Sequence, residues 1–193
     1  MQKLIRTFIA VKADPQPRLL QTIKDLQKAV AGEQVKWVEE DNMHLTLKFL
    51  GDTTPEQIER IVEELKAVSR NFSPLTCHLQ GVGYFRSSGM PRVLFVKIAG
   101  AEILKLLAGE LNTRLSCIGF EPGPRTFSPH ITLARIKYLR DKKAFYHLVK
   151  KYEDLYLQPL YVRELIFYQS VLNATGPVYK KLAVKKLTGI ASG

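Results

Sequence analysis

Several kinds of residue and pattern that define common protein classes are scarce in this sequence. The 193 residues include two cysteines and one tryptophan, and no run of about 18 apolar residues occurs. Two cysteines without a C-x-x-C spacing cannot form a zinc site by themselves, and a disulfide framework is not expected in a chain of this size. We therefore expect no membrane-spanning helix. The start of the chain lacks the apolar segment of a signal peptide, so we expect a cytoplasmic protein.

Motifs for metals and nucleotide cofactors are also missing. There is no H-E-x-x-H pattern, no cluster of aspartates and no glycine-rich phosphate-binding loop. The sequence therefore predicts a protein that uses neither a bound metal nor a cofactor.

Acidic residues are outnumbered by basic ones. The chain has 29 Lys and Arg against 18 Asp and Glu, a net charge of +11. Such a charge favours polyanionic partners such as nucleic acid, because phosphate contacts release counterions. A lysine-rich surface that only contacts water is the alternative.

A short pattern occurs twice in alternating apolar segments. The first copy is His44-Leu45-Thr46-Leu47 and the second is His130-Ile131-Thr132-Leu133. In a β-strand, the period of two places His and Thr on one face and the apolar residues, including Phe49, on the other. Both histidines are therefore expected to lie in strands, each beside a hydroxyl group.

The two copies lie at equivalent places in a repeated order of elements. Each half of the chain reads strand, helix, His-x-Thr strand, helix, strand, and further strands follow at the C-terminal end. From the start of the first strand to the histidine is about 39 residues in the first half and about 38 in the second, which indicates an internal duplication. We expect one domain over residues 1–193 with two lobes, roughly 1–85 and 86–193, whose symmetry brings the two histidines to opposite walls of a cleft. The expected helices and strands are at residues 4–11, 19–30, 55–68, 75–85, 92–98, 101–117, 141–152, 155–163, 164–172 and 178–187.

Two facing histidines can act as acid and base at the same time. Near neutral pH one imidazole can be neutral and the other protonated, which suits cleavage of a phosphate ester. The hydroxyls of Thr46 and Thr132 can stabilise the negative charge on the phosphate oxygens. The alternative is that both are ordinary structural histidines of β-strands. The occurrence of the motif at equivalent places in both halves of the chain argues against this alternative.

Four further residues are candidates for substrate binding. Lys48 is expected on the face of His44, where it could meet a phosphate. Arg135 should point to the opposite face from His130 unless the strand bulges between them. Arg92 lies beside a loop that could reach RNA, and Phe127 could stack on a base. A solvated or core-packing role is the alternative for each.

The chain resembles the two-histidine (2H) phosphoesterases, and within them the RNA 2′,3′-cyclic phosphodiesterases, also called 2′-5′ RNA ligases. Matching segments occur in family order along nearly the whole chain. They are residues 6–11, 44–51, 128–135, 165–170 and 176–179.

The resemblance implies an α+β fold with two pseudo-symmetric antiparallel sheets lining a cleft and helices on the outer faces. It implies hydrolysis of RNA 2′,3′-cyclic phosphate ends to 2′-phosphates without a metal, and reversible 2′-5′ joining of RNA such as tRNA halves. It also implies that His44 is the proton donor, that His130 is the proton acceptor, and that Thr46 and Thr132 bind the phosphate. A monomer is expected.

Two other functions remain open from the sequence. One is a basic RNA-binding module without catalysis, which the charge would explain. The other is a phosphodiesterase of the same superfamily that acts on a small cyclic nucleotide.

Overall fold

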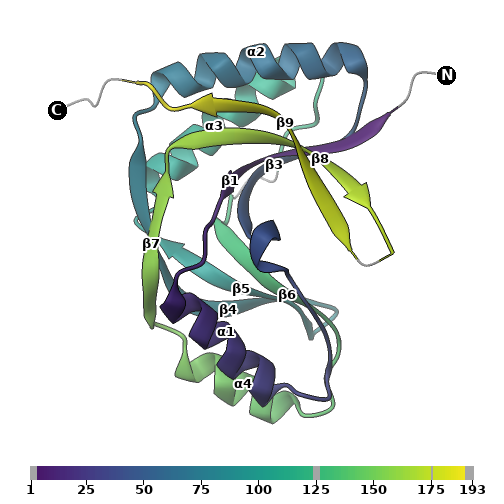
Figure 1. Ribbon diagram of the computed structural model, residues 1–193, viewed down its shortest axis with the longest axis vertical. Coiled ribbons are helices and arrows are strands. Elements are labelled where there is room, and N and C mark those ends of the chain that lie inside the picture. Colours follow the sequence, from purple (N-terminus) through teal and green to yellow (C-terminus); the bar gives the residue numbers. More distant parts are fainter. Residues whose placement is uncertain (1–3, 124–126, 175, 190–193) are drawn as a thin grey trace.

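The computed structural model describes residues 4–123, 127–174 and 176–189 as an α+β protein, as predicted (Figure 1). The helices are α1 (Pro17–Ala29), α2 (Pro55–Asn71), α3 (Glu102–Cys117) and α4 (Lys142–Lys151), with a short 3-10 helix, η1 (Glu40–Asn42). The strands are β1 (Ile5–Lys12), β2 (Gln34–Trp37), β3 (His44–Thr53), β4 (Leu75–Ser87), β5 (Met90–Ala99), β6 (His130–Tyr138), β7 (Tyr156–Val162), β8 (Glu164–Leu172) and β9 (Pro177–Lys186). No helix within these ranges is long and apolar enough to cross a membrane.

All the strands belong to one curled sheet. Its order is β7-β4-β5-β6-β3-β1-β8-β9, and β2 pairs with β6. The two halves of this sheet correspond to the two expected sheets, and they are joined through a single residue pair, Leu45 with Ile131. Because β4 pairs with β5 and β8 pairs with β1, each half of the sheet takes strands from both sides of residue 85.

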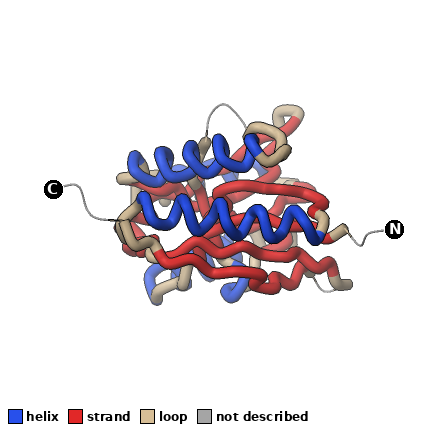
Figure 2. Tube along the Cα trace, turned by 90° about the horizontal axis from the view of Figure 1, so that it is seen from above, coloured by secondary structure: helices blue, strands red, loops and turns tan. Residues whose placement is uncertain are grey.

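The helices are exchanged between the two halves. Helix α1 follows β1 but packs with α4 and β7, whereas α3 follows β5 but packs with α2 and β3. Figure 1 shows α2 and α3 at one end of the molecule and α1 and α4 at the other, and Figure 2 shows a helical layer covering the strands. Each crossing helix therefore ties one half of the sheet to the other.

The N-terminus of α2 forms as its sequence predicts. The Thr54 side chain accepts a hydrogen bond from the Gln57 backbone N–H, and the Gln57 side chain accepts one from the Thr54 N–H. With Pro55 in the first turn, this capping box fixes the start of the helix directly after β3.

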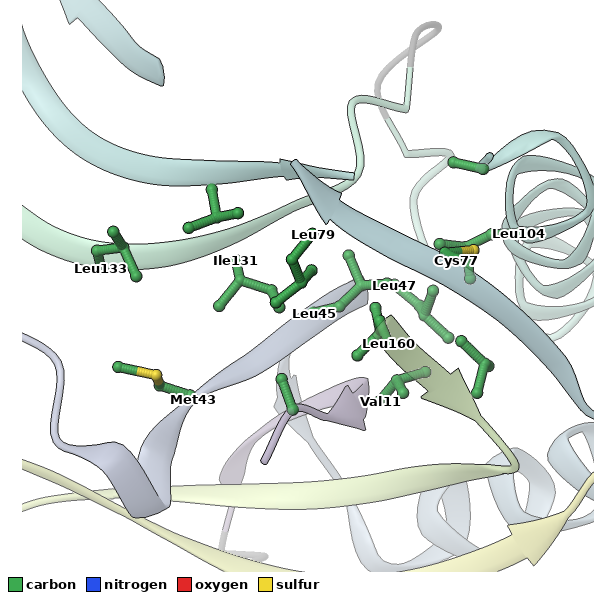
Figure 3. Close-up of a cluster of buried hydrophobic side chains, with 14 of the residues drawn as sticks. Val11, Met43, Leu45, Leu47, Cys77, Leu79, Leu104, Ile131, Leu133 and Leu160 are labelled. Atoms are coloured by element: carbon green, nitrogen blue, oxygen red, sulfur yellow. The ribbon is translucent and has the colours of Figure 1, made fainter. Parts of the chain in front are cut away.

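The apolar residues of both His-x-Thr strands lie in the main core. Leu45, Ile131 and Leu133 are fully buried among residues such as Leu79 and Leu160 (Figure 3). Since side chains alternate along a strand, burial of these residues directs the His and Thr side chains to the opposite face. The predicted alternation is confirmed here, but it fails further along β3, where Phe49 is 67% exposed.

Candidate active site

The two histidines are brought together by strand pairing. His44 and His130 are the first residues of β3 and β6, which run antiparallel with Leu45 opposite Ile131. The residue before Leu45 therefore faces the residue after Ile131, so that His44 lies across from Thr132 and Thr46 lies across from His130. The four residues form a compact group with local twofold symmetry across two adjacent strands of one sheet.

Each imidazole is oriented by the backbone carbonyl two residues before it. Nδ1 of His44 lies 2.6 Å from the carbonyl oxygen of Asn42, and Nδ1 of His130 lies 2.7 Å from that of Ser128. A carbonyl can only accept, so Nδ1 carries a proton and donates it in both residues. The nitrogen that exchanges a proton with a ligand is therefore Nε2 in both histidines.

Aromatic rings hold both imidazoles in place. His44 packs against Phe8 and Tyr179, with ring centroids 5.0 and 5.2 Å apart. His130 packs against Phe85 and Phe95, at 4.8 and 5.2 Å. Neither imidazole can turn away from the shared face without losing these contacts.

The environment of His44 disfavours its charged form. Burial lowers the pKa of His44, the hydrogen bond to Asn42 opposes this change, and the charges of Lys12 and His130 lower the pKa further. The electrostatic effect of His130 on His44 indicates that the two imidazoles lie near each other.

This pKa shift makes stability depend on pH. Below the ordinary imidazole pKa of about 6.5, the unfolded chain takes up a proton at His44 more readily than the folded protein does. We therefore expect the free energy of unfolding to fall as the pH drops below about 6.5, and to fall less steeply in His44→Gln. Urea unfolding of both proteins between pH 7.5 and 5.5 measures the two slopes. Equal slopes would contradict the expectation.

A cavity of about 550 Å³ opens in front of this group. It lies between β2 and β6 on one side and the β8–β9 hairpin on the other, and its size is typical of small-ligand sites. Its lining includes His44, Thr46, Thr132, Arg6 and Arg135, but His130 is not among the lining residues. Across the described parts of the chain, neither threonine hydroxyl and neither arginine side chain makes a hydrogen bond or ion pair. These donors are therefore available to an anionic ligand.

Matching bulges decide which neighbouring residues reach the cavity. On β3, Thr46 pairs with Ala10 and Lys48 with Ile9, so Leu47 is an extra residue. On β6, Thr132 pairs with Phe95 and Ala134 with Leu94, so Leu133 is an extra residue. Each bulge lies three residues after its histidine and reverses the alternation of the following side chains.

The bulge on β6 brings Arg135 into the cavity. A bulge between His130 and Arg135 was the condition under which the sequence allowed Arg135 to bind the substrate. The bulge on β3 does the same for Phe49 and turns Lys48 away. The expected placement of Lys48 on the face of His44, and of Phe49 in the core, was therefore wrong.

Lys48 is instead a buried residue that anchors a loop. It is 7% exposed, and its Nζ donates to Oδ1 of Asn112, at 2.6 Å, and to the carbonyl of Glu121. The same Asn112 oxygen accepts from the backbone N–H of Gly123, at 2.7 Å. Burial lowers the pKa of Lys48, and the nearby Glu121 opposes this effect. Lys48 thus contributes to the structure of the segment that leads towards His130.

The other two candidates also lie outside the cavity. Nη1 of Arg92 donates to the carbonyl of Lys137, at 2.7 Å, and Phe127 packs, half-buried, against the main core. The sequence reasoning missed Arg6, Phe8, Phe49 and Tyr179 as cavity residues. Arg6 and Phe8 alternate on the first strand, and Phe49 and Arg135 both lie five residues after a histidine. These two patterns were the available signals.

Within the described residues, the Nε2 atoms of both imidazoles make no hydrogen bond, and unpaired hydroxyl and guanidinium donors lie nearby. This arrangement suits acid–base cleavage of a phosphate ester. The fold and the site thus define a phosphoesterase. No group of three or more His, Cys, Asp or Glu side chains within the described ranges is placed to hold a metal ion.

Comparison with known proteins agrees with this class. Residues 9–95 and 97–179 match the family described as LigT like Phosphoesterase. A relative from Thermotoga maritima named RNA 2′,3′-cyclic phosphodiesterase is 37% identical over 182 residues, covering 92% of this chain and 93% of the relative. One of the same name from Archaeoglobus fulgidus is 34% identical, covering 93% and 99%. A solved structure from Thermus thermophilus matches this chain with a TM-score of 0.76 and 27% sequence identity. The structure of E. coli LigT in its apo form matches with a TM-score of 0.72 and 25% identity. Each match covers 96% of this chain and 99% of the solved chain. The chain belongs to the LigT-like phosphoesterase family.

Proposed function

We propose that this protein hydrolyses the 2′,3′-cyclic phosphate at the end of an RNA strand to a 2′-phosphate. The observation that carries the proposal is the pairing of β3 with β6, which sets two oriented imidazoles and two free threonine hydroxyls on one face. The names of the relatives, RNA 2′,3′-cyclic phosphodiesterase, support the choice of substrate. A solved structure of E. coli LigT with 3′-AMP, at 25% identity, supports a nucleotide in the site.

In the reaction we propose, each histidine takes the role that the resemblance to the two-histidine phosphoesterases implies. Nε2 of His130 takes a proton from water, whose oxygen attacks the phosphorus. The bond from phosphorus to the 3′ oxygen breaks, and Nε2 of His44 gives this oxygen its proton. The bound phosphate anion favours the protonated form of His44 and so offsets the effect of burial on its pKa.

The hydroxyls and guanidinium groups stabilise the phosphate. Thr46 and Thr132 donate to the non-bridging oxygens, where negative charge increases as water adds. Arg6 and Arg135 contribute positive charge to the same cavity. The same attack by a ribose 5′-hydroxyl in place of water would join RNA ends such as tRNA halves by a 2′-5′ bond and free the 3′-hydroxyl. This joining, which is reversible, is part of the proposal.

A product assay tests the proposed function. We expect an RNA oligonucleotide with a 2′,3′-cyclic phosphate end to be converted to the 2′-phosphate, identified by phosphorus NMR, at the same rate with and without EDTA. A 3′-phosphate product, or loss of activity with EDTA, would contradict the mechanism. Salt-sensitive binding of RNA without turnover would indicate a binding module, and turnover of small cyclic nucleotides only would indicate the other alternative function.

A further inference from the structure

A second, smaller cavity lies behind His44. Its volume is about 210 Å³, and it shares Asn42, His44 and Tyr179 with the cavity described above. These three residues therefore line both cavities. The second cavity is smaller than the roughly 300–1,000 Å³ of sites for whole ligands, so it suits one chemical group of a larger molecule.

The lining of this second cavity is rich in hydrogen-bond donors and includes two lysines. Lys12, Lys181, Tyr168 and Tyr179 contribute side chains, and Asp41 is the one acidic residue that lines it. Nζ of Lys12 donates to the backbone carbonyl of Asp41. Burial raises the pKa of both tyrosines, so their hydroxyls are protonated and can donate.

Two of these donors have no partner of their own. Within the described ranges, Nζ of Lys181 and the hydroxyl of Tyr168 make no hydrogen bond or ion pair. Tyr168 pairs with Lys181 across β8 and β9, and with Phe8 across β1. Paired residues point to the same face, so Lys181 and Tyr168 share the face on which His44 meets Phe8. A free ammonium group and a free hydroxyl thus lie beside a catalytic imidazole.

The two cavities differ in a way that matches the parts of a nucleotide. The larger one includes exposed apolar surface from Phe49, Leu172 and Val178, which suits a nucleoside. The smaller one offers ammonium and hydroxyl groups, which suit an anion. In an RNA strand, the anion nearest to the terminal cyclic phosphate is the phosphodiester on the 5′ oxygen of the same nucleoside.

We propose that the smaller cavity binds the phosphodiester on the 5′ side of the reacting nucleotide, so that Lys181 and Tyr168 favour a polynucleotide over a single cyclic nucleotide. This inference rests on the proposed function and extends it to the choice of substrate. The contact with Lys181 is electrostatic and open to solvent, so its contribution should fall as salt rises.

Two substrates that differ by one phosphodiester and the nucleoside attached to it test the inference. They are adenosine 2′,3′-cyclic phosphate and the dinucleotide ApA that carries the same cyclic phosphate end. We expect Lys181→Ala to lower the ratio of kcat/KM for the dinucleotide to that for the mononucleotide by about tenfold, because one charge-assisted hydrogen bond is lost. Tyr168→Phe should lower the same ratio by about threefold. With the dinucleotide, the slope of log kcat/KM against log salt should become shallower by about 0.7 in Lys181→Ala.

Lys180→Ala is the matched control. Lys180 is the preceding residue on β9, is also exposed, and pairs with Gln169, so it points to the other face. Its removal changes the net charge equally and should leave the ratio unchanged. Equal ratios in Lys181→Ala and Lys180→Ala would overturn the inference. Failure of the unaltered protein to hydrolyse either substrate would instead overturn the proposed function.

Discussion

His44→Ala and His130→Ala are each expected to lower kcat for cyclic phosphate hydrolysis by at least about 100-fold. Each removes a group that transfers a proton in the transition state, and such groups contribute about 10²- to 10⁴-fold. Each imidazole is held by its own backbone carbonyl and its own pair of aromatic rings. Steady-state hydrolysis of a cyclic-phosphate oligonucleotide measures the effect.

His147→Ala is the control for these variants. His147 is an exposed residue of α4, which lies at the end of the molecule away from α2 and α3, and it lines neither cavity. This variant should keep the activity of the unaltered protein. Activity within threefold of that level in either His44→Ala or His130→Ala would contradict the assignment.

The roles of the two histidines can be separated with a sulfur substrate. A cyclic phosphate with sulfur at the 3′ position has a leaving group that needs no proton. If His44 is the acid, this substrate should restore most of the activity of His44→Ala and little of that of His130→Ala. The opposite pattern would exchange the two roles.

Thr46→Val and Thr132→Val are expected to have the second largest effects, with kcat about 100-fold lower in each. Valine keeps the size and branching of threonine but removes the hydroxyl that donates to the phosphate oxygens. Loss of one such donor from a preorganised site costs about 10²- to 10³-fold. Because the donor acts mainly on charge that develops in the transition state, kcat should change more than KM.

Thr76→Val provides the comparison for the threonine variants. Thr76 is an exposed threonine of β4 that lines neither cavity, so its replacement should leave kcat unaltered. Thermal unfolding of the three variants should give similar midpoints, since Thr46 and Thr132 make no side-chain hydrogen bond within the described residues. A large loss of stability in Thr46→Val or Thr132→Val would show a structural role instead.

The secondary structure was largely predictable because its signals are local. The capping box at Thr54, the helical spacing of apolar residues and the two alternating strands each depend on a few neighbouring side chains. The strand β2 and the turn η1 before His44 were missed, since β2 has four residues and forms by pairing with β6, about 100 residues away. Short strands whose pairing is distant carry little signal of their own.

Much of the site was predictable for a different reason. Two copies of His-x-Thr at equivalent places in a duplicated order pointed to one constellation, and the structure places the two strands side by side. The remaining substrate contacts were not predictable in this way. Lys48 and Phe49 were assigned to the wrong faces because one extra residue in β3 reverses the alternation, and a bulge forms only in response to the register of a partner strand.

By itself, the sequence determined most of the elements and the core face at the start of both motif strands, and it pointed to the four central groups, because these follow from local periodicity and from repetition. Only the tertiary structure decided that α1 and α3 cross between the two halves of the sheet, and that Arg135 and Phe49 line the cavity while Lys48 does not. It also decided that a second cavity with two lysines is lined by His44. These features depend on strand register and on contacts between residues far apart in the chain. The free energy that stabilises them comes from packing of the whole sheet, so they cannot be predicted from any short segment of the sequence.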